Sequence, residues 1–295
     1  MARLASARSL TSRLWRRIRQ RPTTGQASDD TAPVIGNVDP RTLPDGGTIV
    51  FRCNLCGTKA RAPLAGLARE TPSCPRCGST VRFRAIAHLI VRELTGSDTP
   101  LPDLAPRRDL AGIGLSDAAC YAETLARAFA YRNTFFHAAP RLDITSIEPG
   151  LRGRHDFVIA SDVFEHVAPP VARAFDNALT LLKPGGVFVM TVPFGLAPDT
   201  VEHYPDLNDW SVEETEGAWN VVNRTADGRV QRFASPVFHG GPGTTLEMRL
   251  FSRDALLREF VRAGFASARI ADEPYLPFGI HWPEPWSVPI VARAP

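Results

Sequence analysis

The sequence is poor in excess charge and in long apolar segments. Residues 1–31 contain no continuous apolar run, so neither a secretory signal nor a membrane span is expected there. The formal net charge is only +3, and arginines before Asp29 supply much of it. The remainder is close to neutral, so a nucleic-acid partner for the main domain is not expected. A hydrophobic content of 44% over 295 residues allows one large core and a smaller module.

Residues 1–46 are expected to form a disordered basic tail and a linker punctuated by Pro and Asp. Within this segment Leu10, Leu14 and Ile18 fall on one helical stripe among arginines. Such an Arg- and Ser-rich, acid-free start also suits an organellar transit peptide or a helix in weak contact with a membrane surface. A cytoplasmic location is the main expectation.

Residues 47–95 contain two C-x-x-C pairs that predict a zinc site. Cys53 and Cys56 form the first pair, Cys74 and Cys77 form the second, and a glycine follows each pair. The two-residue gap lets both sulfurs face one ion, as in a zinc ribbon or rubredoxin-like knuckle. A disulfide-linked secreted domain is the competing interpretation, but there is no signal peptide and only Cys120 remains besides these four. A tetrathiolate site supports folding and is not expected to be catalytic.

An amphipathic helix is predicted over residues 81–94, directly after the knuckle. Its Arg82 and Arg84 could reach a phosphate or an acidic substrate, although helix arginines are more commonly solvated. Residues 95–106, with three prolines, predict a hinge to the next domain.

Residues 155–194 predict a strand, a helix and a second strand. The apolar residues 157–160 suit a strand buried on both faces of a parallel sheet. Two prolines at 169 and 170 can open a helix, Lys-Pro-Gly-Gly at 183–186 ends it, and residues 187–192 form the next strand. The segment therefore predicts a βαβ crossover.

Polar residues follow the first of these strands. Ligands of open parallel sheets lie beyond the carboxyl ends of the strands, so Ser161, Asp162, Glu165 and His166 are candidates for lining a site. The alternative is a capping box, in which Ser161 or Asp162 caps a short helix and Glu165 completes the cap.

The succession of a strand, D-x-x-E-H, a helix ending in L-K-P-G-G and a strand ending in T-x-P resembles the second half of class I S-adenosylmethionine-dependent methyltransferases. The resemblance implies an α/β fold with a Rossmann-like doubly wound sheet over residues 105–295, and S-adenosylmethionine as cofactor. It is closest to bacterial type-11-like domains that carry an N-terminal cysteine-rich knuckle and a G-I-G-L-S-D loop. Those domains are often associated with glycosyltransferases.

By this resemblance the cofactor loop is expected over residues 110–117, followed by a helix over 118–130. The candidate cofactor-binding residues are Gly112, Gly114, Ser116, Asp117, Asp143, Ser161 and Asp162. The glycines would let the backbone approach the methionine part of the cofactor. The apolar segment 134–136, expected to be the second strand, is not followed by the acid that usually binds the ribose hydroxyls. Asp143 is expected to meet the adenine amino group, and its alternative role is to cap a turn.

A substrate cap is predicted over residues 195–250, because the connection is too long for a plain loop. It contains a predicted hairpin across residues 226–229 and several aromatic, histidine and glycine residues, which suit a gated pocket. His166, Asp162 and His203 are the catalytic candidates, with Glu165 as a supporting group.

Three functions fit these features. The first is methyl transfer to a small molecule, sugar or glycan acceptor. The second is methylation of an RNA base, since some ribosomal RNA enzymes join a zinc knuckle to this fold. The third is a non-catalytic methyltransferase-like domain that binds a partner or glycan, because the glycine loop is degraded.

Overall fold

The structure is a computed structural model that describes residues 47–295. The predicted tail and linker, 1–46, lie outside the described residues. Within residues 47–295 no helix is long and apolar enough to cross a membrane.

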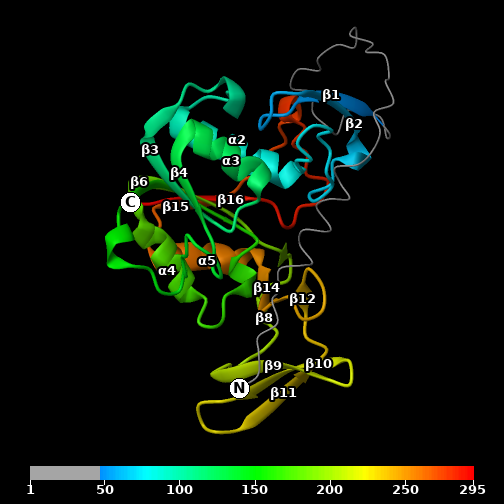
Figure 1. Ribbon diagram of the computed structural model, residues 1–295, viewed down its shortest axis with the longest axis vertical. Helices are drawn as coiled ribbons and strands as arrows, with labels where there is room; N and C mark the ends of the chain where they lie inside the picture. The colour runs from blue at the N-terminus through cyan, green and yellow to red at the C-terminus, as the bar shows by residue number, and fades with distance from the viewer. Residues whose placement is uncertain (1–46) are drawn as a thin grey trace. The chain divides into compact units, whose positions relative to one another are not determined.

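The centre of the fold is a six-stranded sheet (Figure 1). Its strands are, in spatial order, β15 (Ser267–Ile270), β16 (Ile290–Arg293), β6 (Leu182–Thr191), β5 (His155–Ser161), β3 (Arg107–Leu115) and β4 (Phe129–Thr134). The four strands from β6 to β4 are parallel, whereas β16 runs antiparallel to both of its neighbours. The predicted βαβ crossover is confirmed as β5, α4 (Ala172–Leu181) and β6.

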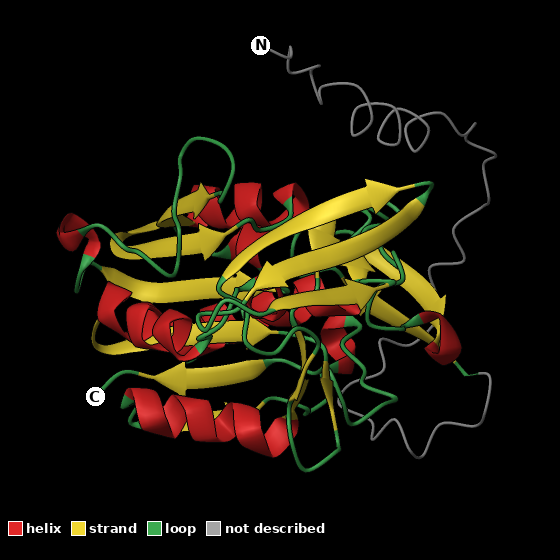
Figure 2. Ribbon diagram, turned by 90° about the horizontal axis from the view of Figure 1, so that it is seen from below, coloured by secondary structure: helices red, strands yellow, loops and turns green. Residues whose placement is uncertain are grey.

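Helices cover both faces of this sheet (Figure 2). On one face α2 (Val81–Thr95) and α3 (Ala119–Ala128) share a core with β5 residues such as Phe157. On the other face α4 and α5 (Arg253–Ala263) pack against the neighbouring Val158. Alternate residues of a strand point to opposite faces, so β5 contributes to both cores. This is why its sequence is continuously apolar.

Two boundaries differ from the prediction. The helix expected over 118–130 ends at Ala128, because β4 begins at Phe129. The second parallel strand is therefore 129–134 and not 134–136. In β4 the buried residues Phe129 and Tyr131 alternate with exposed ones, which is the period of a strand covered on one face.

The cysteine-rich segment packs directly on the sheet. It consists of β1 (Thr48–Arg52), β2 (Lys59–Pro63), a 3-10 turn (Leu64–Gly66) and α2. Ile49 and Phe51 belong to the same buried cluster as Phe157 of β5. The expected hinge contains a 3-10 turn (Leu101–Asp103), and Leu101 is buried in that cluster. The cysteine-rich segment, or knuckle, and the central sheet therefore share one hydrophobic core.

The predicted insert forms short strands and a separate small sheet. Its strands are β7 (Phe194–Gly195), β8 (Val201–Glu202), β9 (Asp209–Thr215), β10 (Ala218–Arg224), β11 (Val230–Ala234), β12 (Phe238–His239), β13 (Thr245–Leu246) and β14 (Arg249–Ser252). Strands β9 to β11 form an antiparallel sheet, seen at the lower end of Figure 1. The predicted hairpin across 226–229 is confirmed as β10 and β11. Three 3-10 turns complete the fold, at Pro149–Leu151, Phe164–His166 and Leu276–Phe278.

Candidate active site

The carboxyl ends of four parallel strands meet at one edge. Leu115 of β3 is paired with Thr134 on one side and Ala160 on the other, and Ser161 of β5 is paired with Thr191 of β6. The residues that follow, among them Ser116 and Asp162, are therefore brought to this edge. Ser116 and Asp162 therefore lie beyond the carboxyl ends of the strands, as the sequence predicted.

Asp162 occupies the first position after β5 in a left-handed backbone conformation. Its φ is 53°, which is uncommon for a residue other than glycine and is tolerated best by Asp and Asn. The turn is held because the Asp162 N–H donates to the Thr191 carbonyl at 2.8 Å and the Thr191 hydroxyl donates to Oδ1 at 2.9 Å. The backbone thus aims the carboxylate away from the strand and toward the cysteine-rich segment.

Two arginines from that segment bind the Asp162 carboxylate. Arg69 donates to both oxygens, at 2.7 and 3.1 Å, and Nη1 of Arg82 lies 3.4 Å from Oδ2. Burial raises the pKa of Asp162, but the hydrogen bonds of Arg69 and the charges of both arginines outweigh it and hold that pKa below its usual value. The Asp162 side chain is only 7% exposed, so this pairing takes place almost out of water.

Sequence reasoning missed this pairing. Arg82 is a partly buried partner of Ser161 and Asp162 and not a solvated helix arginine, and Glu70 pairs with both Arg69 and Arg82. Arg84 is also fully buried. The sequence could have indicated in part where Arg82 and Arg84 lie. Helix α2 directly follows the cysteine-rich segment, so the first turn of α2 must pack beside that segment.

The Glu165 and His166 pair lies on the 3-10 turn Phe164–His166. No side chain caps this turn, so the capping-box interpretation is wrong. The turn is held instead by the insert: the Met248 N–H donates to the Glu165 carbonyl at 2.7 Å, and Arg249 donates to the carbonyls of Phe164 and Val167. Strand β14 of the insert therefore fixes the turn.

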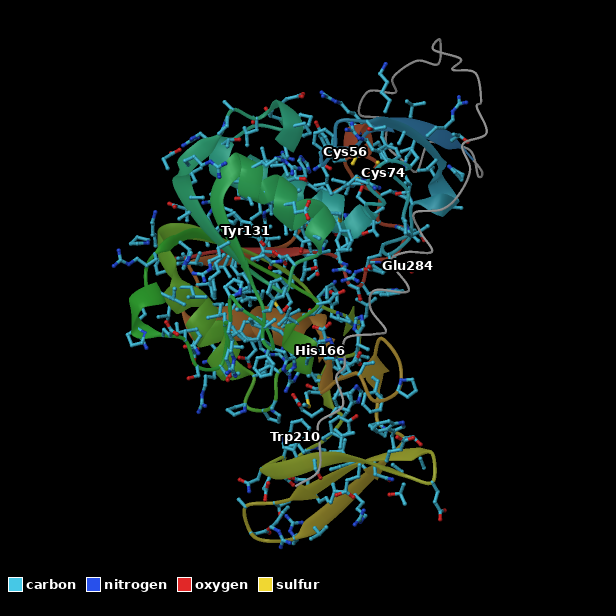
Figure 3. All side chains as sticks on the ribbon, in the orientation of Figure 1. Cys56, Cys74, Tyr131, His166, Trp210 and Glu284 are labelled. Atoms are coloured by element: carbon cyan, nitrogen blue, oxygen red, sulfur yellow. The ribbon has the colours of Figure 1, made fainter. Side chains whose placement is uncertain are left out.

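Around this turn the structure brings together the predicted histidines and two acids. His166 Nε2 lies 3.6 Å from Glu165 Oε1, and His203 Nε2 lies 3.2 Å from Glu247 Oε1. The rings of His166 and His239 are 5.2 Å apart. Figure 3 labels His166 above the three-stranded sheet. His239 and Glu247 were not singled out as site residues, because only the fold of the insert brings them here.

Burial controls the protonation of the pair. Glu165 is fully buried, and burial, together with the charge of Asp162, raises its pKa well above the usual value. Burial also lowers the pKa of His166, against the hydrogen bond with the Leu246 carbonyl. Both shifts favour the neutral forms at physiological pH, so His166 is able to accept a proton.

The cofactor side of the edge differs from the expected glycine loop. Gly112 and Gly114 lie inside strand β3, paired with both neighbouring strands, so the prediction that they form a loop is wrong. A Cβ at Gly112 would lie 2.0 Å from the ring of Phe157, and one at Gly114 would lie 1.9 Å from the Tyr131 hydroxyl. These glycines therefore make room for aromatic side chains of neighbouring strands.

Asp117 points into the protein. Its carboxylate accepts hydrogen bonds from the hydroxyls of Tyr121 and Tyr131, at 2.6 and 2.5 Å. Tyr131 is labelled in Figure 3. Burial raises the pKa of Asp117 to about 7, although both tyrosines favour the ionised form. Ser116, with φ 58°, forms the actual turn at the end of β3, and its N–H donates to Thr134.

Asp143 lies on a separate turn. Its Oδ1 accepts hydrogen bonds from the backbone N–H and the hydroxyl of Thr145, so it does make the turn cap that was its alternative role. It also lines a cavity of about 570 Å³ that includes Thr134 at the end of β4 and Arg132. This volume is in the range of small-molecule sites.

The four knuckle cysteines converge. The Sγ atoms of Cys53 and Cys77, and those of Cys56 and Cys74, are 3.6 Å apart, and all four lie within 4.8 Å of one another. Figure 3 labels Cys56 and Cys74. No disulfide joins them among the described residues. Four thiolates about 2.3 Å from one tetrahedral ion would lie about 3.8 Å apart, so the spacing fits a metal ion.

Comparison with known proteins places this fold in a family. Residues 102–268, more than half of the chain, match the family described as methyltransferase domain. The chain therefore belongs to this methyltransferase family.

Among solved structures, one similar protein is an amino pentose methyltransferase of Micromonospora echinaspora, solved with S-adenosylmethionine. It is 16% identical, with 74% of this chain and 93% of that chain covered and a TM-score of 0.41. Another is a sugar N-methyltransferase of Streptoalloteichus, 14% identical, with 74% and 89% covered and a TM-score of 0.42. Among proteins with curated descriptions, none matches this chain.

Proposed function

We propose that the chain is an S-adenosylmethionine-dependent methyltransferase that acts on a small molecule, sugar or glycan. The observation that carries this proposal is the group of Asp162, Glu165, His166 and His203 beside the carboxyl ends of β5 and β6. An edge of this kind in a parallel sheet is where ligands bind, and it here holds groups able to orient and deprotonate an acceptor.

The cofactor, when bound, supplies a methyl group on a positively charged sulfur. Ser116, which follows β3, and Ser161, which ends β5, would line its methionine part, while Asp143 and Thr134 at the cavity would line the rest. Arg69 and Arg82 already pair with the Asp162 carboxylate, so it would position these arginines at the edge and is not free to bind a cationic ligand.

Methyl transfer needs an acceptor lone pair in line with the sulfur–carbon bond and a site that excludes water. The cofactor would supply the methyl group and keep the electron pair of the broken sulfur–carbon bond, while the residues at this edge would orient the acceptor. The acceptor must lose a proton, and neutral His166 or the His203–Glu247 pair would take it.

The charges at this edge favour an uncharged acceptor. Glu165 and Glu247 lie beside the histidines, and the nearby cations are already used: Arg69 binds Asp162 and Arg249 binds Glu202. Within residues 47–295, Arg69, Arg82 and Arg249 at this edge already bind carboxylates, so a phosphate-rich acceptor such as RNA would find these arginines occupied. Carboxylates and imidazoles instead suit the hydroxyl and amino groups of a sugar or glycan.

Transfer of a labelled methyl group to acceptors of different chemistry tests this function. Amino sugars, neutral oligosaccharides and an RNA oligomer would be compared, each with wild type and His166→Ala. We expect label on a saccharide or similar small molecule, and much less with the variant. Label on the RNA alone would contradict the acceptor class, and the absence of all transfer would favour a binding domain.

We also propose that Cys53, Cys56, Cys74 and Cys77 bind one Zn²⁺. Gly57 and Gly78, with φ of 76° and 66°, let the chain turn back after each cysteine pair. The N–H groups of these glycines donate to the carbonyls of Cys53 and Cys74 at 2.8 and 2.9 Å. Zinc would hold this turn geometry and thereby the folded segment.

A buried charge supports the zinc proposal. Arg84 is 0% exposed, and its hydrogen bonds go to Ser79 and to the Gly279 carbonyl, with no carboxylate partner within residues 47–295. An isolated buried guanidinium is costly. A zinc ion with four thiolates carries a net charge of about −2, and the nearby cysteines would then supply the counter-charge.

A further inference from the structure

The Glu165 carboxylate is buried without a partner. It is 0% exposed, and within residues 47–295 neither of its oxygens has a hydrogen-bond donor. Glu247 and Asp162 add negative charge nearby. In this described part of the chain the group has no hydrogen-bond partner as a neutral acid, and as a carboxylate it has no cation, so in either form it lacks a ligand.

The ring of His166 is oriented as a metal ligand would be. A carbonyl oxygen can only accept, so Nδ1 donates to the Leu246 carbonyl, at 2.9 Å. Nε2 is then left with its lone pair, 3.6 Å from Glu165 Oε1. Metal-binding histidines commonly donate their second ring N–H to a carbonyl in this way, because the bond fixes the tautomer and the ring.

His239 completes the group from the insert. One ligand atom from each of Glu165, His166 and His239 lies within 4.8 Å of the others. Bonds of about 2.1 Å to one ion would bring such atoms to within about 4.2 Å. His239 is exposed and ends β12, so a small shift of this one residue closes the remaining gap.

The turn after His239 is itself well braced. The Thr244 hydroxyl donates to the His239 carbonyl at 2.6 Å. Gly243, with φ 74°, packs against Trp219 so closely that a Cβ would lie 2.6 Å from the indole. The glycine-containing turn 240–243 thereby helps to bring His239 to the acceptor edge.

We propose that Glu165, His166 and His239 bind a divalent transition-metal ion. Two imidazoles and one carboxylate are a ligand set for Zn²⁺, Mn²⁺ or Fe²⁺, and three protein ligands leave positions open for other groups.

The role of this ion rests on the proposed methyltransferase function. An ion at the acceptor edge would bind two neighbouring oxygens of a polyhydroxylated acceptor in its open positions. It would lower the pKa of a bound hydroxyl as it lowers that of bound water. Because the Nε2 lone pair of His166 would then bind the ion, the released proton would pass to solvent or to His203 and not to His166. The acceptor class would then be vicinal diols and related chelating groups.

Binding of Mn²⁺, followed by electron paramagnetic resonance, tests the site in protein whose cysteine site is filled with zinc. Mn²⁺ prefers oxygen and nitrogen ligands and competes poorly for thiolates. We expect one Mn²⁺ per chain, and affinity at least tenfold weaker in both Glu165→Gln and His239→Ala. His137→Ala, which removes an exposed histidine elsewhere, is the matched control and should bind as wild type does.

Zinc content and circular dichroism establish that each variant is folded. Absence of Mn²⁺ binding up to about 1 mM, or wild-type affinity in both variants, would overturn the proposal. Titration of the same samples with S-adenosylhomocysteine separates the two hypotheses. If the protein binds S-adenosylhomocysteine but does not bind Mn²⁺, only the metal-site proposal is rejected. If it binds Mn²⁺ but not S-adenosylhomocysteine, only the methyltransferase proposal is rejected.

Discussion

The two halves of the proposed catalytic edge are built by different means. On the acceptor half, at the ends of β5 and β6, charged side chains from four separate segments meet. These are Arg69 from the knuckle, Asp162 from the end of β5, Glu165 from the 3-10 turn and Arg249 from the insert. On the cofactor half, at the ends of β3 and β4, glycines give space to Tyr131 and Phe157. One half depends on long-range ion pairs and the other on close packing within the sheet.

This difference explains which variants should damage which half. Ion pairs and hydrogen bonds on the acceptor half need the knuckle and the insert to be folded. The packing on the cofactor half lies inside the shared core: β3, β4 and β5 supply the glycines and the two rings, and Asp117 and Tyr121 next to β3 add to it.

Loss of zinc should produce the largest effect and should damage the acceptor half first. Arg69 lies between the two cysteine pairs, so Cys74→Ser would release both the ion and the segment that binds Asp162. We expect a loss of at least about 4 kcal/mol in unfolding free energy, measured by urea denaturation together with zinc content. Cys120→Ser is the control, and an equal loss there would contradict the assignment.

The pH dependence of Asp117 should be the next largest effect and belongs to the cofactor half. Its folded pKa, about 7, lies above the unfolded value, so the stability that protonation gives is complete at low pH and is lost as pH rises through about 7. Relative to Asp117→Asn, wild type should lose about 3 kcal/mol between pH 5 and 8. If the unfolding free energies of the two proteins change with pH in parallel, the pKa of Asp117 is not raised in the folded protein.

Removal of the His166 imidazole should affect chemistry more than cofactor binding. A group that orients the acceptor or takes its proton acts mainly in the transition state, so His166→Ala should slow single-turnover methyl transfer by about 100-fold. Affinity for S-adenosylhomocysteine should change little. If His166→Ala and His203→Ala both keep wild-type rates, acid–base assistance from this half is wrong.

A methyl group at Gly114 should disturb the packing of the cofactor half. A Cβ there would lie 1.9 Å from the Tyr131 hydroxyl and 2.2 Å from Oδ2 of Asp117. Gly114→Ala should therefore lower unfolding free energy by about 2 kcal/mol in a denaturation experiment. Gly150→Ala, where a Cβ would meet nothing within 4 Å, should be nearly neutral. Equal costs would mean that the strand relaxes freely.

Asp143 should give the smallest effect, because Thr145 already satisfies part of its carboxylate. We expect Asp143→Ala to weaken S-adenosylhomocysteine binding by about 1 kcal/mol in calorimetry. Thr145→Val removes the partner and keeps the carboxylate, so it should bind more tightly than Asp143→Ala. Unchanged affinity in Asp143→Ala would refute its contact with the adenine.

The sequence predicted the acceptor half better than the cofactor half. The β5–α4–β6 crossover and the position of Asp162 follow from hydrophobic periodicity and punctuation, which are local signals. The glycines of β3 were misassigned because G-x-G marks both a phosphate-type loop and a strand crowded by aromatic residues. Arg69, His239 and Glu247 could not be found, since only the tertiary fold brings them to Asp162 and His166.

Calorimetric titration of the zinc-loaded protein with S-adenosylhomocysteine tests the central claim most directly. It asks whether the cofactor half of the edge binds the cofactor, before any acceptor is known. We predict saturable binding of one ligand per chain, weakened by Asp143→Ala and little changed by His166→Ala. No binding even at millimolar ligand would contradict the claim and would identify the chain as a methyltransferase-like domain without this cofactor.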